Sequence, residues 1–301
     1  MSVRLERLLP AGRIAIAAWA LTTGWVSGCA SEDAEGTDGA ATTDQSIIHG
    51  SASSVAQDAV IMLRIGDHAL CSGTLVAPNL VLTARHCVSE TDEGIECGAD
   101  GNAIQGGAVG ADRAPDQLVV YTGRRTSSLM EAAHATRIFH DGATNLCNHD
   151  LALLLLDRDV TDVTPAPLRL TDSTKAGESV TSVGWGLTTK DTIPSARQQR
   201  KQVAILDVGP SEQTASHQMV VGESICSGDS GGPALSQQGA VIGVVSYGGG
   251  GGSDADPTRP SASCTGPTAR NTYTRIAPFA SLIRSAFKLA KHTPSLEPAA
   301  R

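Results

Sequence analysis

The last third of the chain contains the stretch Cys226-Ser227-Gly228-Asp229-Ser230-Gly231-Gly232-Pro233. It sets one serine in a glycine-rich loop beside an acid, with a cysteine available to pin the loop. A serine hydroxyl is a weak nucleophile and needs a base within reach. Glycine permits a turn that aims backbone N–H groups at one point, as an oxyanion intermediate requires. An inert glycine-rich turn is the alternative, so the rest of the chain has to decide.

Two upstream motifs supply candidate partners for the serine. Thr83-Ala84-Arg85-His86-Cys87 follows a short apolar run, and Asn148-His149-Asp150 precedes a longer one. The order along the chain is therefore His86, Asp150 and Ser230. These motifs and this order resemble the trypsin/chymotrypsin-like serine proteases, whereas subtilisins and α/β-hydrolases use other orders.

Further segments extend the resemblance over roughly residues 47–290. It implies an all-β fold of two six-stranded antiparallel β-barrels with a C-terminal α-helix. The first barrel would carry His86 and Asp150, and the second would carry Ser230. The additional matching segments are Cys71-Ser72-Gly73-Thr74-Leu75-Val76, Gly184-Trp185-Gly186, Ser246-Tyr247-Gly248 and Tyr273-Thr274-Arg275-Ile276.

The resemblance also assigns a chemistry. Ser230 Oγ would attack a carbonyl carbon, while His86 would take the serine proton and pass it to the leaving group. Asp150 would hold the tautomer of His86 and stabilise the imidazolium. The N–H groups of Gly228 and Ser230 would form the oxyanion hole. A non-catalytic binding protein on a protease scaffold and an esterase with the same machinery are the alternatives.

The hydrophobic pattern independently predicts an all-β barrel or sandwich, because short apolar segments alternate with Gly, Pro, Asn and Asp. One helix is predicted near the C-terminus, where Pro278 suits the first turn and Pro294 ends the helix. Its apolar residues recur at helical spacing and are Phe279, Leu282, Ile283, Ala286 and Ala290. The apolar strand segments are 59–65, 70–76, 80–83, 118–121, 152–156, 180–183, 203–208, 240–245 and 272–276.

The N-terminus has the pattern of an export signal. Arginines precede the apolar run 14–26, which is too short to span a bilayer stably. The run ends in Val26-Ser27-Gly28-Cys29, which resembles the bacterial lipobox and predicts a lipid on Cys29. Cleavage of an ordinary signal peptide, for example after Ala30, is the alternative. The chain is therefore expected to be bacterial, exported and anchored to a membrane.

The sequence divides into four expected parts. Residues 1–28 form the signal peptide, and residues 29–46 form a tether or pro-segment. The tether is acidic and nearly free of apolar bulk, so it predicts disorder. Residues 47–291 form the protease domain, and residues 292–301 form a flexible tail.

The segment Ile47-Ile48-His49-Gly50 resembles the start of mature family members. In the family, cleavage frees an ammonium that pairs with the acid preceding the nucleophile, here Asp229. The resemblance thus predicts a zymogen that is cut between Ser46 and Ile47. Before cleavage, Asp229 is expected to turn outward, because an unpaired buried charge is costly. Ser46 departs from the basic residue usual there, and a constitutively active enzyme is the alternative.

The chain has seven cysteines, and with Cys29 set aside the other six indicate an oxidising compartment. The resemblance implies the disulfides Cys71–Cys87 and Cys226–Cys264. This leaves Cys97 and Cys147, which either form a third disulfide or remain reduced thiols.

The resemblance places Ser224 at the base of the primary specificity pocket. A buried cation needs an anionic partner, and Ser224 is neutral, so cleavage after Arg or Lys is not expected. Asn271 replaces a glycine usual in the pocket wall and narrows the pocket. The segment Ser246-Tyr247-Gly248 would align the substrate, with Tyr247 in place of the usual tryptophan. A small or medium neutral residue is therefore expected before the cut.

Two other features depart from the family pattern. Arg85 stands where alanine is usual, so it either crowds His86 or reaches solvent. The segment 248–263 is far longer and richer in glycine than usual, and is either a tolerated insertion or a mobile pocket rim.

Composition excludes several classes of function. The formal net charge is −8, which does not favour nucleic acid. The histidines lack zinc-ligand spacing, so no metal and no cofactor are expected. The expected partners are protein or peptide substrates, an activating protease, and a membrane reached through the lipid on Cys29 before activation.

Overall fold

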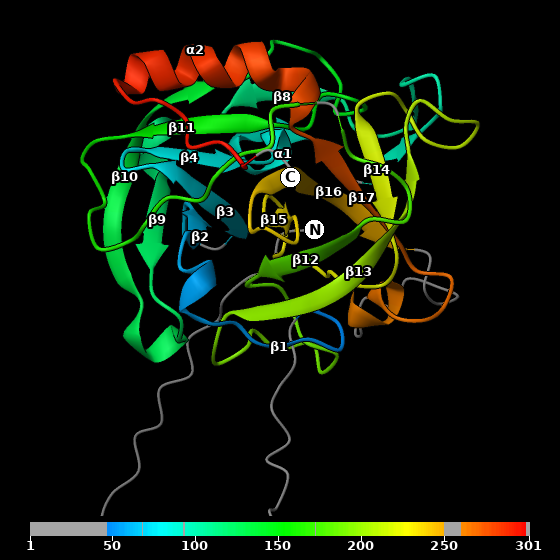
Figure 1. Ribbon diagram of the computed structural model, residues 1–301, viewed down its shortest axis with the longest axis horizontal. Coiled ribbons are helices and arrows are strands. Elements are labelled where there is room, and N and C mark those ends of the chain that lie inside the picture. The colour runs from blue at the N-terminus through cyan, green and yellow to red at the C-terminus, as the bar shows by residue number, and fades with distance from the viewer. Residues whose placement is uncertain (1–46, 68, 93, 172, 250–259, 299–301) are drawn as a thin grey trace, which may run out of the picture.

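The computed structural model describes residues 47–298, with the exception of residues 68, 93, 172 and 250–259. The described chain folds into two six-stranded antiparallel β-barrels and a C-terminal helix (Figure 1). The predicted fold class is therefore confirmed. The predicted signal peptide, the acidic tether with Cys29, and most of the glycine-rich insertion lie outside the described residues.

The first barrel closes through strands in the order β10-β11-β4-β3-β2-β9. Its core is aliphatic, because the leucine-rich strands β4 and β11 pair with each other and are mostly buried. Full burial of one such side chain contributes about 1.5–3 kcal/mol. The strands are β2 (Val60–Ile65), β3 (Ala69–Ala77), β4 (Leu80–Thr83), β9 (Leu118–Thr122), β10 (Met130–Phe139) and β11 (Ala152–Leu156).

The second barrel follows the order β13-β12-β15-β16-β17-β14 and closes through pairing of β13 with β14. Strand β1 (Ser51–Ala52) pairs with β13 in the same sheet. Ile47 is fully buried in the core of this barrel, beside Ile225 and Tyr273 in the same cluster. The barrel strands are β12 (Ser179–Gly184), β13 (Gln198–Val208), β14 (Gln218–Val221), β15 (Pro233–Leu235), β16 (Val241–Gly249) and β17 (Arg270–Arg275).

Short elements connect the barrel strands. Helix α1 (Arg85–Val88) follows β4 directly, and two small hairpins follow α1. One hairpin pairs β5 (Ser89–Thr91) with β8 (Val109–Asp112), and the other pairs β6 (Glu96–Cys97) with β7 (Ala103–Gln105). The 3-10 turns are η1 (Val55–Gln57), η2 (Pro115–Gln117), η3 (Thr126–Ser128), η4 (Pro260–Cys264) and η5 (Ala277–Phe279).

The C-terminal helix α2 (Ala280–Ala290) lies across the first barrel (Figure 1), where it contacts β4 and β11. Its apolar face, which includes Ile283 and Phe287, is buried against the barrel. The helix ends at Ala290, and its C-cap Lys291 takes the left-handed conformation with φ +60. None of the helices in the described residues is long and apolar enough to cross a bilayer.

The tail after α2 differs from the flexible tail expected for residues 292–301. Leu168 N–H donates to Ser295 O at 2.8 Å, and Glu297 N–H donates to Leu168 O at 2.9 Å. The side chain of Arg169, only 14% exposed, is paired with Glu297 on one side and Glu178 on the other. A buried guanidinium needs such carboxylates, and this requirement holds the described part of the tail to the body.

Three disulfides connect the described cysteines, and they are the pairings considered from the sequence. Cys71 bonds to Cys87, Cys97 to Cys147, and Cys226 to Cys264. Disulfides persist in oxidising compartments, so these bonds are consistent with export.

Candidate active site

His86 lies where strand β4 passes into helix α1. Ala84 is extended, with φ −83 and ψ 151, and the helix begins at Arg85 and is only one turn long. The side chain of His86 is 22% exposed, so it can meet both the protein and a substrate. Its Nδ1–H donates to Asp150 Oδ2 at 2.8 Å, and its backbone N–H donates to Asp150 Oδ1 at 2.9 Å. Asp150 therefore holds both the ring and the backbone of His86.

Asp150 is buried and remains ionised. Burial by itself would raise the pKa of Asp150, but the charge of His86 and hydrogen bonds from His86 and Ser246 outweigh it and hold the pKa below its usual range. Ser246 Oγ donates to Asp150 Oδ2 at 2.5 Å. Because an ionised carboxylate only accepts, Nδ1 of His86 carries a proton, and in the neutral imidazole Nε2 is then the nitrogen that holds the lone pair. His86 is thus arranged as a base.

Ser230 approaches this pair from the second barrel. A Cβ added to its neighbour Gly231 would lie 3.0 Å from Ala84 N, so the loop packs closely against the segment that leads into His86. On the other side, Gly231 N–H donates to the β16 carbonyl that immediately precedes Ser246. Among the described residues, Ser230 Oγ and His86 Nε2 do not form a hydrogen bond. Such bonds often tighten only when substrate is bound.

The nucleophile loop has several backbone N–H groups with no acceptor among the described residues. Gly228 has φ +98, a conformation that favours glycine. The N–H groups of Asp229, Gly231 and Gly232 donate within the protein. Within the described chain, those of Gly228 and Ser230 do not. These are the two groups that the sequence predicted for an oxyanion hole.

Asp229 is fully buried in the uncleaved chain, which corrects the expectation that it turns outward. Its carboxylate accepts hydrogen bonds from Gly186 N–H at 2.8 Å and Cys226 N–H at 2.9 Å. Burial raises the pKa of Asp229 to about 7, because these two bonds only partly offset desolvation and no cation among the described residues adds to them. A neutral acid avoids most of the cost of burying a charge, which explains why the side chain stays inside.

Ser224 and Asn271, the residues predicted for the base and wall of the primary pocket, are both fully buried. Asn271 Nδ2 donates to Gly222 O at 2.9 Å and to Ser224 Oγ at 3.3 Å. Asn271 Oδ1 is buried and has no hydrogen-bond partner among the described residues. It lies so close to Gly248 that a Cβ there would be 2.2 Å away. Asn271 therefore connects Ser224 to Gly248, which is in the strand segment predicted to align substrate.

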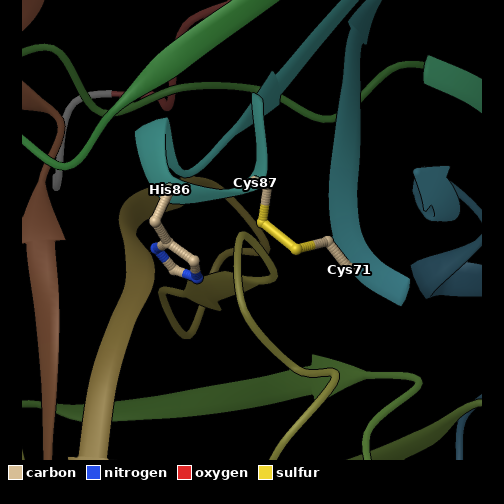
Figure 2. Close-up of side chains that lie close together, drawn as sticks. All are labelled: Cys71, His86 and Cys87. Carbon is tan, nitrogen blue, oxygen red and sulfur yellow. A yellow bond between two sulfur atoms is a disulfide. The ribbon is translucent and has the colours of Figure 1, made fainter. Parts of the chain in front are cut away.

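The neighbours of His86 in the sequence, Arg85 and Cys87, both lie inside the protein. Figure 2 shows the imidazole of His86 beside the disulfide that joins Cys87 to Cys71. The two sulfurs lie close enough to the ring to suggest a metal site, but they are bonded to each other and offer no thiolate. Arg85 turns inward, where it is 5% exposed and its Nε donates to Ser89 Oγ at 2.7 Å.

The trypsin family model matches residues 47–283 of the chain. The chain belongs to the trypsin family. This trypsin-family chain is 28% identical over 192 residues to a trypsin from Saccharopolyspora erythraea, which covers 59% of this chain and 75% of that protein. It is 26% identical over 232 residues to granzyme M from Rattus norvegicus, which covers 71% of this chain and 78% of the relative.

A solved structure of neuropsin, a serine protease expressed in the limbic system of mouse brain, has the same fold. It superposes on this trypsin-family chain with a TM-score of 0.58 at 21% sequence identity. The superposition covers 80% of this chain and 100% of neuropsin. The likeness at this identity concerns the fold.

Ser72 is a residue of the site that sequence reasoning did not single out. Its Oγ donates to Gly228 O at 3.0 Å and accepts from Trp185 N–H at 3.1 Å. Its backbone N–H donates to Ser230 O at 2.8 Å. Ser72 is fully buried, so it fixes the nucleophile loop of this trypsin-family chain from the first barrel. Its only sequence signal is its position next to Cys71.

Replacing Ser72 by alanine is expected to lower kcat about 10- to 100-fold with little change in KM. Leaving a buried carbonyl unpaired costs about 1–3 kcal/mol, and here the carbonyl belongs to the peptide that orients the loop. Peptide hydrolysis would be measured per active site, with Ser281→Ala on the exposed face of α2 as the control. A kcat equal to that of the control would show that Ser72 does not hold the loop.

Proposed function

We propose that this chain is a serine endopeptidase that works through Ser230, His86 and Asp150. The observation that carries the proposal is the set of bonds around Asp150. It is buried and ionised, and it accepts from the ring of His86, the backbone of His86 and Ser246. Asp150 therefore needs a cationic neighbour, and His86 becomes one when it takes a proton. These contacts favour a catalytic protease, in which His86 acts as a base, over a non-catalytic binding protein on a protease scaffold.

The steps follow from the groups in place. Ser230 Oγ attacks the carbonyl carbon of a peptide bond while His86 Nε2 takes the serine proton. The carbonyl oxygen becomes an oxyanion, which the N–H groups of Gly228 and Ser230 stabilise. His86 then gives its proton to the leaving amine, and an acyl group remains on Ser230. Water, deprotonated by His86, then attacks the carbonyl carbon of this ester, and His86 returns the proton to Ser230 Oγ as the C–O bond breaks and the acid leaves.

The pocket supports cleavage after a small neutral residue. Ser224 offers no charge to an arginine or lysine, and Asn271 occupies space that a larger side chain would need. A peptide library is expected to be cut after alanine or serine, and Asn271→Gly is expected to extend cleavage to larger apolar residues. The change should be at least about tenfold in kcat/KM, the usual effect of adding room for a methylene group or more. Efficient cleavage after arginine by the wild type would contradict this pocket.

Activation by cleavage between Ser46 and Ile47 is supported by the environment of Ile47. Its side chain is buried in the core of the second barrel, yet its φ is +48. A β-branched residue rarely takes this conformation, and the strain depends on the peptide bond to Ser46. Cleavage removes that constraint and creates an ammonium. Ile47 lies in the same core cluster as Tyr273, and the charge of Asp229 is one of the causes that raise the pKa of Tyr273. We expect the ammonium of Ile47 to supply the cation that Asp229 lacks.

Ser46 is a small neutral residue of the kind that the proposed pocket accepts. Self-activation is therefore compatible with the proposed specificity, as is cleavage by another protease. A lipid on Cys29 would hold the uncleaved chain at a membrane. Cleavage after Ser46 would then release the enzyme, because the three described disulfides join only cysteines after Ile47. Mature protein that begins at Ile47 and stays in washed membranes would contradict this release.

The proposed function is tested by incubating exported protein with a fluorophosphonate probe and analysing it by mass spectrometry. The label is expected on Ser230, in chains whose N-terminus is Ile47. Label on uncleaved chains would keep the enzyme and reject the zymogen. Absence of label on chains shown to begin at Ile47 would reject the enzyme.

A further inference from the structure

A second set of polar contacts joins the helix that carries His86 to a hairpin that follows it. The set begins at Arg85, which departs from the family pattern and whose side chain is only 6% exposed. Arg85 Nε donates to Ser89 Oγ at 2.7 Å, and Arg85 Nη2 donates to Asp112 Oδ1 at 3.3 Å. Ser89 Oγ in turn donates to the same oxygen of Asp112 at 2.6 Å. Residues at both ends of helix α1 are therefore bonded to Asp112.

The other carboxylate oxygen of Asp112 faces the segment that follows strand β10. His140 Nε2 lies 2.8 Å from Asp112 Oδ2, and Gly142 N–H donates to His140 Nδ1 at 3.0 Å. An imidazole nitrogen that accepts a hydrogen bond carries no proton, so the proton of His140 is on Nε2 and points to Asp112. One carboxylate thus bonds to helix α1 through Oδ1 and to this segment through Oδ2.

The segment after β10 also contacts the residue beside the catalytic acid. Asp141 Oδ2 lies 2.6 Å from His149 Nδ1, and His149 directly precedes Asp150. These contacts form a path from helix α1 through Asp112 to Asp150. The path runs in parallel with the direct hydrogen bond between His86 and Asp150.

Asp112 is suited to hold the two segments together because it is ionised. Its side chain is 35% exposed, and burial by itself would raise its pKa. Hydrogen bonds from Ser89 and His140, with the charges of His140 and Arg85, outweigh burial and hold the pKa of Asp112 below its usual range. An ionised acceptor makes stronger hydrogen bonds than a neutral one. Loss of Asp112 would leave the buried Arg85 without its carboxylate and would free both segments to shift.

We propose that Asp112 is a positioning residue that keeps His86 and Asp150 in the geometry in which the imidazole acts as a base. It holds helix α1 to the segment 140–150 and acts only through these neighbours. Displacement of a catalytic group lowers kcat, while substrate binding need not change. The inference deepens the proposed function and rests on it, because it concerns the base of the proposed protease.

The first test compares Asp112→Ala with Asp162→Ala, a control at an exposed aspartate. In Asp112→Ala, kcat for peptide hydrolysis per titrated active site is expected to fall about 10- to 100-fold, because a misplacement of about 1 Å can cost that much. KM should stay within about twofold. The rate constant at which a fluorophosphonate labels Ser230 should fall in parallel, because that reaction also needs the base.

A second measurement follows the geometry itself and needs no catalysis. The Nδ1 proton of His86 is bonded to Asp150, and its exchange with water can be followed by NMR in chains with nitrogen-labelled histidine. In Asp112→Ala the exchange rate is expected to rise about tenfold, because the bond between His86 and Asp150 opens more often. The exchange rate in Asp162→Ala should equal that of the wild type.

Asp112→Asn separates the two sides of Asp112. Its single amide oxygen is expected to face the donors Arg85 and Ser89, so its NH₂ group faces His140, from which it cannot accept. In this variant and in His140→Ala, kcat should fall about threefold to tenfold. The two changes combined should lose little more than either alone, because both remove the same bond. Losses that multiplied would show that His140 does not act through Asp112 and would contradict the proposal.

Values of kcat and of the exchange rate in Asp112→Ala within about twofold of the control would overturn the proposal. So would a lower Tm with unchanged kcat, since Asp112 would then only stabilise the fold. If Asp112→Ala does not fold, a control-like kcat in Asp112→Asn would overturn it equally. Failure of the proposed function is seen separately, as wild-type chains that begin at Ile47 but take no fluorophosphonate on Ser230. The exchange measurement remains readable in that case.

Discussion

Replacing Ser230 by alanine is expected to reduce kcat for peptide hydrolysis by about 10⁶-fold, close to the effect of removing a whole triad. The reason is that the nucleophile and its base act as one unit. Without the serine hydroxyl, His86 has no serine proton to accept. The hydrogen bonds between His86 and Asp150 then no longer contribute to activating a nucleophile. Rates would be measured on a peptide with a neutral residue before the cut, and fluorophosphonate labelling should disappear in parallel.

Three comparisons give this prediction its controls. Ser227→Ala changes a half-buried serine in the same loop, and should keep most of the activity because no catalytic step uses it. His86→Ala should cost about as much as Ser230→Ala, and the double variant should lose little more. Losses that multiplied instead would show that the two residues act independently. Peptide hydrolysis that survived in Ser230→Ala would reject Ser230 as the nucleophile.

Much of the fold could be predicted because the barrel strands with a strong apolar run are bounded in the sequence by turn residues. Strand β10 shows where this fails. Its buried positions include Ala133 and Ala135, which give little hydrophobic signal, while Met130 and Glu131 are exposed. Strand β15 is only three residues long and starts at a proline, so the sequence pattern cannot separate it from the nucleophile loop. The family resemblance, and not periodicity, supplied the complete barrels.

The candidate site divides in a similar way. His86 and Ser230 could be found because each lies in a short motif that a local pattern can recognise. Ser72 could not, because its role depends on partners far along the chain. Ser72 contacts Gly228, which lies 156 positions away in the sequence. A lone serine carries no information about such a contact until the two barrels are assembled.

The tail shows how an ion pair can hold a segment that is expected to be flexible, here residues 292–301. Its described part is held by Arg169, because the guanidinium is mostly buried and Glu297 offers it a carboxylate. The contact spans 128 positions, so no local pattern could reveal it.

Replacing Asp229 by asparagine is expected to have the second-largest effect. In the cleaved enzyme it should lower kcat, whereas in the uncleaved chain it should change how stability depends on pH. In the cleaved enzyme, Asp229→Asn removes the anion that should pair with the Ile47 ammonium. The oxyanion hole then loses its support, so kcat should fall by about 10²- to 10³-fold, as when one donor of such a hole is removed. The fall would be measured per active site on the same peptide substrate.

In the uncleaved chain the same substitution should act on stability and its pH dependence. Unfolded Asp229 loses its proton near pH 3.8, whereas burial in the folded chain raises its pKa to about 7. Between these values the folded state holds the extra proton, so the free energy of unfolding falls as pH rises. The difference of about 3 units corresponds to a loss on the order of 4 kcal/mol between pH 4 and pH 7.

This loss can be isolated by urea unfolding of uncleaved Ser230→Ala chains with and without Asp229→Asn. Other carboxylates contribute equally to both, so the difference between the two pH profiles belongs to Asp229. Burial of Ile47 and Ile48 contributes roughly 3–6 kcal/mol to the folded arrangement. Near pH 4, where Asp229 is neutral, this is enough to keep Asp229 buried. Near pH 7 it barely exceeds the cost of burying the ionised carboxylate. The expected result is therefore that, between pH 4 and pH 7, the free energy of unfolding of Ser230→Ala falls relative to that of the double variant, and that this relative fall is absent in chains that begin at Ile47. Identical profiles for the two uncleaved chains would mean that Asp229 lies in solvent before cleavage, and that cleavage brings it inside.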